Sequence, residues 1–220
     1  VSGSLDNTIR LWDVPVSKPS ITHQANQGAT SLALNADGTQ WLTGGADKVL
    51  RIWNAADRML VKEIGPLPHP IVRVAFRGDK AQVAAADAAG FVRYFNPADG
   101  APQGVFGTHA VEITGLAYAP NNSWILTSGA EGLVKRWPNQ AQPTKTAAGH
   151  EQPVLTLRVS PNNSMVATGS ADKTCRLWNN GNQQPLRNLD GHGGAVTALS
   201  FQFDGGRLVT GCEDKIARLF

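Results

Sequence analysis

The most constraining feature of this 220-residue chain is a repeat that runs along its whole length. Each copy ends in an aromatic residue, and successive aromatics are 41, 42, 42, 41 and 42 residues apart. These aromatics are Trp12, Trp53, Phe95, Trp137, Trp178 and Phe220. A period of roughly 20–50 residues indicates a solenoid, propeller or array, because each repeat is one supersecondary unit that must stack on its neighbours to bury a core.

Further positions keep this spacing. A base stands two residues before each aromatic: Arg10, Arg51, Arg93, Lys135, Arg176 and Arg218. A small residue stands ten before: Ser2, Thr43, Ala85, Thr127, Thr168 and Thr210. In five of the six copies an acid stands six before, namely Asp6, Asp47, Glu131, Asp172 and Asp214, and the third copy has Ala89 there. Chance does not hold several columns in phase along a whole chain, so the columns describe one structural unit.

Each period is predicted to contain four short strands. Apolar residues alternate at 154–159 and 196–201, as in a strand with one buried face. Asn, Asp, Gly and Pro follow these segments, and they are the residues that tight turns favour. A second strand over 165–170 then leads through a turn to a third strand over 174–178. Four-stranded sheets at this period are typical of a β-propeller, with one sheet per blade.

The repeat resembles that of the WD-repeat family, and the resemblance covers the whole chain. It rests on Gly149-His150 followed by Asp172 and Trp178, on Gly191-His192 followed by Asp214 and Phe220, and on Trp12-Asp13. The resemblance implies an all-β fold, a β-propeller of four-stranded antiparallel blades. It also implies a function in binding protein or peptide partners.

Residues 1–220 are predicted to form a single propeller domain of about 21 strands. These strands amount to about five blades plus one extra strand, so the propeller is expected to be incomplete at both ends. The chain begins within a repeat at Val1, without Met, which favours a fragment of a longer WD-repeat protein. A compact five-bladed ring with one redundant strand is a second interpretation, and a ring completed by another copy of the chain is a third.

Composition restricts the classes of partner. A net charge of +3 does not indicate nucleic acid or an anionic membrane, and no apolar run approaches the roughly 18 residues of a membrane span. Cys175 and Cys212 have neither metal-type spacing nor a disulfide framework. We therefore expect no nucleic acid, no membrane and no cofactor, and we expect a cytoplasmic protein. The partner's identity and the oligomeric state stay open.

The histidines are predicted to be structural. His109, His150 and His192 each lie 28 residues before an aromatic, so they form one column of the repeat. The resemblance implies that His150, Thr168, Asp172 and Trp178 form a hydrogen-bonded structural tetrad. The tetrad is expected to be complete only there, because a Glu replaces the Asp in the His109 period and Phe220 lacks an indole N–H.

A partner is predicted to dock on loops that the rigid blades present. In the family, this face carries the turn before the third strand and the loop before the first. Ala occupies four of the six positions just before the tight-turn acid, so the face is small and weakly polar. His69, Gln152 and Glu213 are the best candidates for partner-binding residues.

The sequence therefore favours a non-catalytic scaffold that binds proteins or peptides. The alternative is a regulatory or targeting propeller module of a larger multidomain enzyme, with its catalytic part outside this chain. A propeller hydrolase is disfavoured because every Ser, His and acid that could form a triad belongs to a repeated column, whereas catalysis needs one site. No catalytic, cofactor-binding or metal residue is predicted.

Overall fold

The structure is a computed structural model of the chain. It describes the backbone of residues 2–3, 8–12, 19–24, 28–138 and 145–220, and the side chains of residues 28–105, 109–138 and 146–220. The chain divides into two compact units, Val1–Phe106 and Gly107–Phe220. Each unit is described by itself.

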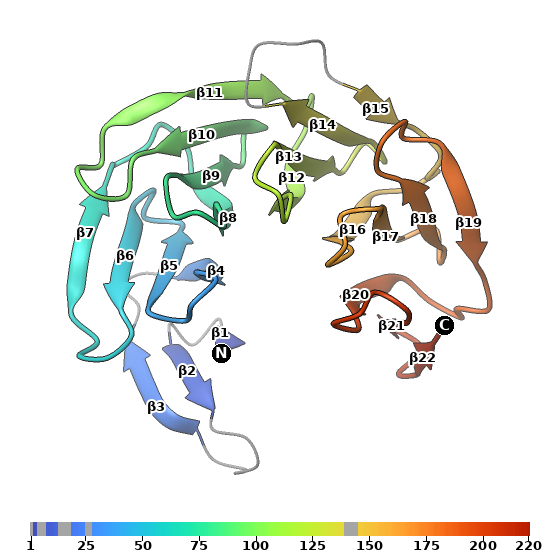
Figure 1. The fold of residues 1–220 in the computed structure, drawn as a ribbon, viewed down its shortest axis with the longest axis horizontal. Coiled ribbons are helices and arrows are strands. Elements are labelled where there is room, and N and C mark those ends of the chain that lie inside the picture. Colours follow the sequence, from blue (N-terminus) through green and yellow to red (C-terminus); the bar gives the residue numbers. More distant parts are fainter. Residues whose placement is uncertain (1, 4–7, 13–18, 25–27, 139–144) are drawn as a thin grey trace. The chain divides into compact units, whose positions relative to one another are not determined.

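The first unit contains three antiparallel sheets, with strand orders β1-β2-β3, β4-β5-β6-β7 and β11-β10-β9-β8 (Figure 1). The strands are β1 (Ser2–Gly3), β2 (Thr8–Trp12), β3 (Pro19–Gln24), β4 (Ala29–Leu34), β5 (Gln40–Gly45), β6 (Leu50–Asn54), β7 (Leu60–Ile64), β8 (Ile71–Phe76), β9 (Val83–Asp87), β10 (Phe91–Phe95) and β11 (Pro102–Thr108). Strands that follow one another in sequence are neighbours in each sheet.

The second unit repeats this arrangement, with strand orders β12-β13-β14-β15, β16-β17-β18-β19 and β20-β21-β22. The strands are β12 (Ile113–Tyr118), β13 (Trp124–Gly129), β14 (Val134–Pro138), β15 (Lys145–Ala147), β16 (Val154–Val159), β17 (Met165–Ser170), β18 (Cys175–Asn179), β19 (Pro185–Leu189), β20 (Val196–Phe201), β21 (Leu208–Cys212) and β22 (Ala217–Leu219).

These antiparallel sheets of three or four strands confirm the predicted all-β class and the predicted blade. The described residues form 22 strands, close to the expected 21, and the strands at the two ends form separate three-stranded sheets. That residues 1–220 form a single domain stays a prediction. No helix long and apolar enough to cross a membrane occurs among the described residues.

Neighbouring sheets within a unit pack closely through their second strands. Every residue of the second strands β9 and β13 is buried. At Gly44 on β5, an added Cβ would lie 2.5 Å from Ile71 Cγ2 and 2.8 Å from Val74 Cγ1, both on β8. Glycine at this position therefore lets the side chains of β8 rest directly on the backbone of β5.

Hydrogen bonds also join the first strands of adjacent sheets. The Thr30 hydroxyl on β4 donates to the carbonyl of Ile71 on β8 at 2.5 Å. The backbone N–H of Val74, also on β8, donates to Ser31 Oγ at 3.1 Å. Backbone groups of β8 that no strand pairs on this side are thus satisfied by side chains of the next sheet.

The predicted turns recur at fixed positions in the repeat. The residue fifteen before each of the last five aromatics has φ between 60° and 75°: Gly38, Lys80, Asn122, Asn163 and Gly205. The residue five before these aromatics has φ between 66° and 87°: Lys48, Gly90, Gly132, Lys173 and Lys215. This left-handed conformation explains the choice of Gly and Asn at several of these positions.

Candidate functional site

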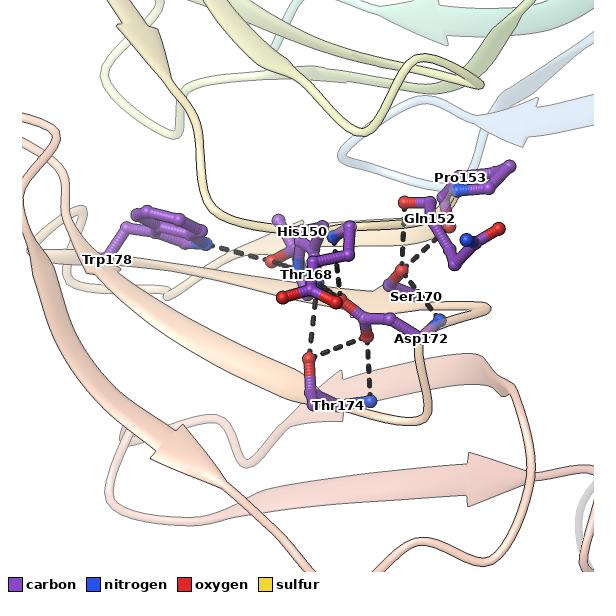
Figure 2. Close-up of polar contacts among 9 residues, drawn as sticks. His150, Gln152, Pro153, Thr168, Ser170, Asp172, Thr174 and Trp178 are labelled. Atoms are coloured by element: carbon purple, nitrogen blue, oxygen red, sulfur yellow. Dashed lines mark hydrogen bonds and ion pairs between the residues drawn. The ribbon is translucent and has the colours of Figure 1, made fainter.

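The structure brings the four residues of the expected tetrad together in the second unit. His150 precedes β16, Thr168 lies on β17, Asp172 lies in the turn after β17 and Trp178 lies on β18 (Figure 2). His150 Nδ1–H donates to Asp172 Oδ2 at 2.8 Å, and His150 Nε2 accepts from the Thr168 hydroxyl at 2.7 Å. The Trp178 indole N–H donates to the same hydroxyl at 2.8 Å. The network ties the loop to the second and third strands.

Asp172 also accepts hydrogen bonds within its own turn. Its Oδ1 accepts from the Thr174 backbone N–H at 2.9 Å and from the Thr174 hydroxyl at 2.7 Å. Burial raises the pKa of Asp172, but hydrogen bonds from Thr174 and His150 outweigh burial and lower this pKa to about 2. The carboxylate is therefore ionised at neutral pH and holds the loop and the turn in one geometry.

A second four-residue network surrounds His109, where the sequence predicted an incomplete one. His109 Nδ1–H donates to Glu131 Oε1 at 2.5 Å, and His109 Nε2 accepts from the Thr127 hydroxyl at 2.6 Å. The Trp137 indole N–H donates to Thr127 Oγ1 at 2.8 Å. The expectation that only the His150 tetrad is complete was wrong, because the longer Glu side chain still reaches the imidazole.

The third histidine of the column makes fewer contacts. His192 Nε2 lies 2.8 Å from Thr210 Oγ1, but its buried Nδ1 has no side-chain partner among the described residues. Asp214 instead pairs with Arg218 at 2.7 Å and accepts from the Gly193 N–H at 2.8 Å. Phe220 offers no indole N–H, so the network of this sheet is partial.

Burial lowers the pKa of His109, His150 and His192, although the acid beside His109 and His150 opposes the effect. A histidine whose pKa is lower in the folded state binds fewer protons there than when unfolded. Its contribution to stability is therefore present above pH 6.5, the ordinary histidine pKa, and is lost as pH falls towards the folded value. These side chains are structural groups that stay neutral at pH 7.

We therefore expect the stability of the chain to fall as pH is lowered from 7.5 to 5. The slope is about 1.4 kcal/mol per pH unit for each proton by which the unfolded state exceeds the folded one. Urea unfolding at several pH values measures this slope. The variant His150→Gln should show a shallower slope than the unmodified chain, and an equal slope in both would contradict this role for His150.

The sheet β8–β11 lacks the network and carries a different cluster. In this sheet, the repeat positions that elsewhere hold the histidine, hydroxyl, acid and indole residues are occupied by Leu67, Ala85, Ala89 and Phe95. Asp87, at the end of β9, is completely buried in their place. Its Oδ1 accepts from the backbone N–H groups of Ala89 at 3.1 Å and Phe91 at 3.0 Å, and its Oδ2 pairs with Arg93.

His69 and Phe91 complete this Asp87 cluster, which consists of His69, Asp87, Phe91 and Arg93. His69 Nδ1 lies 3.5 Å from Asp87 Oδ2. The His69 and Phe91 rings are parallel to within 6°, with centroids 6.4 Å apart. The Arg93 guanidinium carbon lies 5.1 Å from the Phe91 centroid. Sequence reasoning missed Asp87, although an acid two residues before an empty acid column was a visible signal.

The three predicted partner-binding residues lie at what we call the loop–turn edge of a sheet. This edge consists of the loop before the first strand and the turn between the second and third strands. A backbone hydrogen bond joins the two, for example from Ala171 N–H to Pro153 O at 3.0 Å and from Glu213 N–H to Ala195 O at 2.9 Å. Gln152 and Glu213 are exposed in the second unit, and His69 is 45% exposed in the first.

Four side chains of the basic column, Arg51, Arg93, Lys135 and Arg218, form ion pairs with acids. Arg51 pairs with Asp47 at 2.5 Å and with Glu63 at 2.7 Å, and Lys135 lies 3.8 Å from Glu131. These ion pairs occupy the cationic groups of Arg51 and Lys135.

The described residues contain no group of three His, Cys, Asp or Glu side chains placed to hold a metal ion. Burial raises the pKa of the Cys175 thiol to about 12.

Comparison with known proteins identifies the repeat. The family model described as WD domain, G-beta repeat matches residues 1–13, 17–54, 100–138, 141–179 and 183–220, which is more than half of the chain. The matched segments leave out residues 55–99, which include β7 to β10 and the Asp87 cluster. The departure of this sheet from the repeat is therefore visible in both sequence and structure.

Similar curated proteins are much longer than the matched region. Apoptotic protease-activating factor 1 of Rattus norvegicus is 26% identical over 147 residues, covering 62% of this chain and 12% of that protein. Actin-interacting protein 1 of Drosophila melanogaster is 30% identical over 161 residues, covering 68% and 26%. A coronin-like protein of Saccharomyces cerevisiae is 38% identical over 65 residues, covering 30% and 10%. The chain thus spans about a tenth to a quarter of these relatives.

Proposed function

Because the chain belongs to the WD domain, G-beta repeat family, we propose that it is a non-catalytic scaffold that binds a protein or peptide partner at its loop–turn edges. WD repeats generally mediate protein–protein interactions, and proteins that contain them are generally non-catalytic scaffolds. The partner docks on exposed side chains such as those of Gln152 and Glu213. Each sheet supplies a rigid frame, and the loops supply the specificity.

The networks of His109 and His150 are the observation that carries this proposal. Both imidazoles are buried and use both ring nitrogens in hydrogen bonds within their own sheets. A catalytic base must reach a substrate proton, and these groups face the interior. What the networks do is fix the loop–turn edges, so that exposed residues on adjacent sheets keep a constant spacing.

The names of two relatives support a protein partner. The Drosophila melanogaster relative is named for an interaction with actin, and a Schizosaccharomyces pombe relative, 26% identical over 114 residues, is named as a subunit of the target of rapamycin complex. These names concern those proteins. For this chain they support a protein partner.

The alternative is a regulatory or targeting module within a larger enzyme. The match to 12% of apoptotic protease-activating factor 1 favours a modular role of this kind, because the matched repeats are one part of a much longer protein. In both cases this chain supplies binding, and chemistry, where it exists, lies in other residues.

Affinity capture from a cell extract tests the proposed function. Gln152→Arg combined with Glu213→Arg changes two loop–turn edges of the second unit. Gln184→Arg combined with Gln202→Arg is the matched control, because these exposed residues lie at turns at the other ends of the same two sheets. We expect the first pair to reduce retained proteins at least tenfold and the control to change them less than twofold. No retained protein, or equal losses, would contradict the proposal.

A further inference from the structure

An open apolar groove lies between the last two sheets of the second unit, β16–β19 and β20–β22. Its volume is about 150 Å³. A cavity of roughly this size with apolar walls holds one benzene-sized ring. Phe220 is 37% exposed, so the groove is reached from solvent. We call it the inter-sheet groove, and its apolar walls are Met165, Leu177, Leu189, Phe201, Leu208 and Phe220.

The preceding pair of sheets shows what fills the corresponding place. Trp124 on β13 stands thirteen residues before the aromatic of its repeat, as Met165 on β17 does. Trp124 is 1% exposed and belongs to one buried cluster with Trp178, whose counterpart at the groove is Phe220. An indole therefore lies between the sheets β12–β15 and β16–β19, whereas the smaller side chain of Met165 leaves the next space open.

A guanidinium covers the buried indole, and guanidinium groups also line the groove. The Arg136 guanidinium carbon lies 5.0 Å from the centroid of the Trp124 ring. At the groove, Leu177 takes the position of Arg136, but Arg187 on β19 and Arg207 before β21 contribute to the walls. Both arginines are exposed, and neither makes an ion pair with a residue whose side chain the structure describes.

The apolar walls and the arginines, rather than net charge, point to an aromatic occupant. Exposed Asp204 lies in the same turn as Arg207, and exposed Asp190 follows β19, so acids accompany the cations. An arginine is attracted to the face of an aromatic ring, most strongly to that of tryptophan. An aliphatic side chain would fill the apolar space but would offer the arginines no ring.

We propose that the inter-sheet groove binds one tryptophan side chain from a peptide segment of a partner protein, with Arg187 or Arg207 over the face of the indole. This inference rests on the proposed scaffold function and adds a second contact surface, because Gln152 and Glu213 do not line the groove. An aromatic side chain seated in a pocket is the kind of contact that carries much of the binding energy at protein interfaces.

The two methionines of the chain give a site-specific test. Met165 lines the groove, whereas Met59 is 66% exposed in the first unit. NMR spectra of the whole chain with isotope-labelled methionine methyl groups are recorded while the peptide Gly-Ser-Gln-Trp-Gln-Ser-Gly is added. We expect the indole ring to shift the Met165 signal saturably and to leave the Met59 signal in place. The same peptide with Leu for Trp should bind at least tenfold more weakly.

Filling the groove from within should block the peptide. Met165→Trp supplies the indole that Trp124 supplies to the preceding pair of sheets, so we expect it to raise Kd at least tenfold. Fluorine NMR of the peptide with a fluorinated tryptophan measures Kd for each variant. Met59→Trp is the matched control, because it makes the same change at an exposed site, and it should change Kd less than twofold.

The arginines are tested by surface substitutions, which should leave the urea midpoint nearly unchanged. Arg187→Gln combined with Arg207→Gln should raise Kd about three- to fivefold, the effect of losing one exposed cation–π contact. Lys173→Gln combined with Lys215→Gln is the matched control, because these exposed lysines lie at the loop–turn edges of the same two sheets. The control should change Kd less than twofold.

Three outcomes would overturn the inference: an unmoved Met165 signal, equal binding of the Trp and Leu peptides, or equal losses from the arginine and lysine pairs. If Met165→Trp does not fold, the methyl shift and the arginine pair decide. Failure of the peptide alone leaves the scaffold proposal standing if captured proteins still depend on Gln152 and Glu213. Failure of both experiments removes both proposals.

Discussion

Thr168→Val is expected to lower the free energy of unfolding by about 2–6 kcal/mol. Valine keeps the shape of threonine but removes the hydroxyl that accepts from the Trp178 indole and donates to His150 Nε2. Both partners are buried. A buried polar group that loses its partner costs about 1–3 kcal/mol, and this substitution affects two such groups.

Urea unfolding followed by tryptophan fluorescence measures this effect. Thr39→Val is the matched control, because the Thr39 side chain is exposed and its hydroxyl bonds only to neighbours in its own turn, Asp37 and Asn35. The control should cost about 1 kcal/mol or less. Equal costs for the two variants would show that the network around Thr168 does not lock its sheet.

Asp87→Ala is expected to destabilise the chain by about 2–4 kcal/mol. The substitution leaves the Arg93 guanidinium without its carboxylate and removes the acceptor for the Ala89 and Phe91 N–H groups. Removing one partner of a buried ion pair costs about 3–5 kcal/mol, and the partial exposure of Arg93 reduces that figure.

A double-mutant cycle separates the charge from the other contacts of Asp87. Arg93→Met keeps most of the side-chain volume and removes the charge, so Asp87→Ala combined with Arg93→Met should cost less than the sum of the two single variants. Additive costs would mean that the ion pair contributes little. His69→Gln should cost less than 1 kcal/mol, as expected for an exposed side chain. A larger cost for Asp87→Ala than for His69→Gln would show that Asp87 supports the cluster and that His69 acts as a surface residue.

The fold could be predicted from the sequence because one unit is repeated. A strand assignment at 154–159 is weak alone, but the same pattern at 196–201 and at a constant distance from an aromatic makes it strong. The observed strands Val154–Val159 and Val196–Phe201 agree with these ranges. Turn positions could be predicted for the same reason, since Gly and Asn recur where the backbone is left-handed.

The details of the site depend on side-chain reach, which a repeat does not encode. Replacement of Asp by Glu at 131 looked like a loss, yet the longer side chain contacts His109 Nδ1 at 2.5 Å. Asp214 has the expected identity, yet Arg218 and the Gly193 N–H occupy it and His192 Nδ1 makes no hydrogen bond with it. The residue types show which hydrogen bonds are possible, but only the structure shows which of them form.

Asp87 was overlooked in the sequence because it lies two residues before the acid column, although that column is empty in this repeat. His69 was predicted as a surface residue from its place in the loop, but its support from Asp87 and Phe91 was not. The general point is that a repeat predicts the shared framework. Residues that depart from the columns, as in the sheet β8–β11, must be placed by the structure.

The bond from Val74 N–H to Ser31 Oγ makes one amide a reporter of how adjacent sheets separate. This proton belongs to β8, but its acceptor belongs to β4, so exchange with deuterium requires the two sheets to part rather than a strand to fray. Amides bonded within a sheet report a different opening. The exchange rate of a single proton therefore measures how often one blade of the first unit comes away from the next.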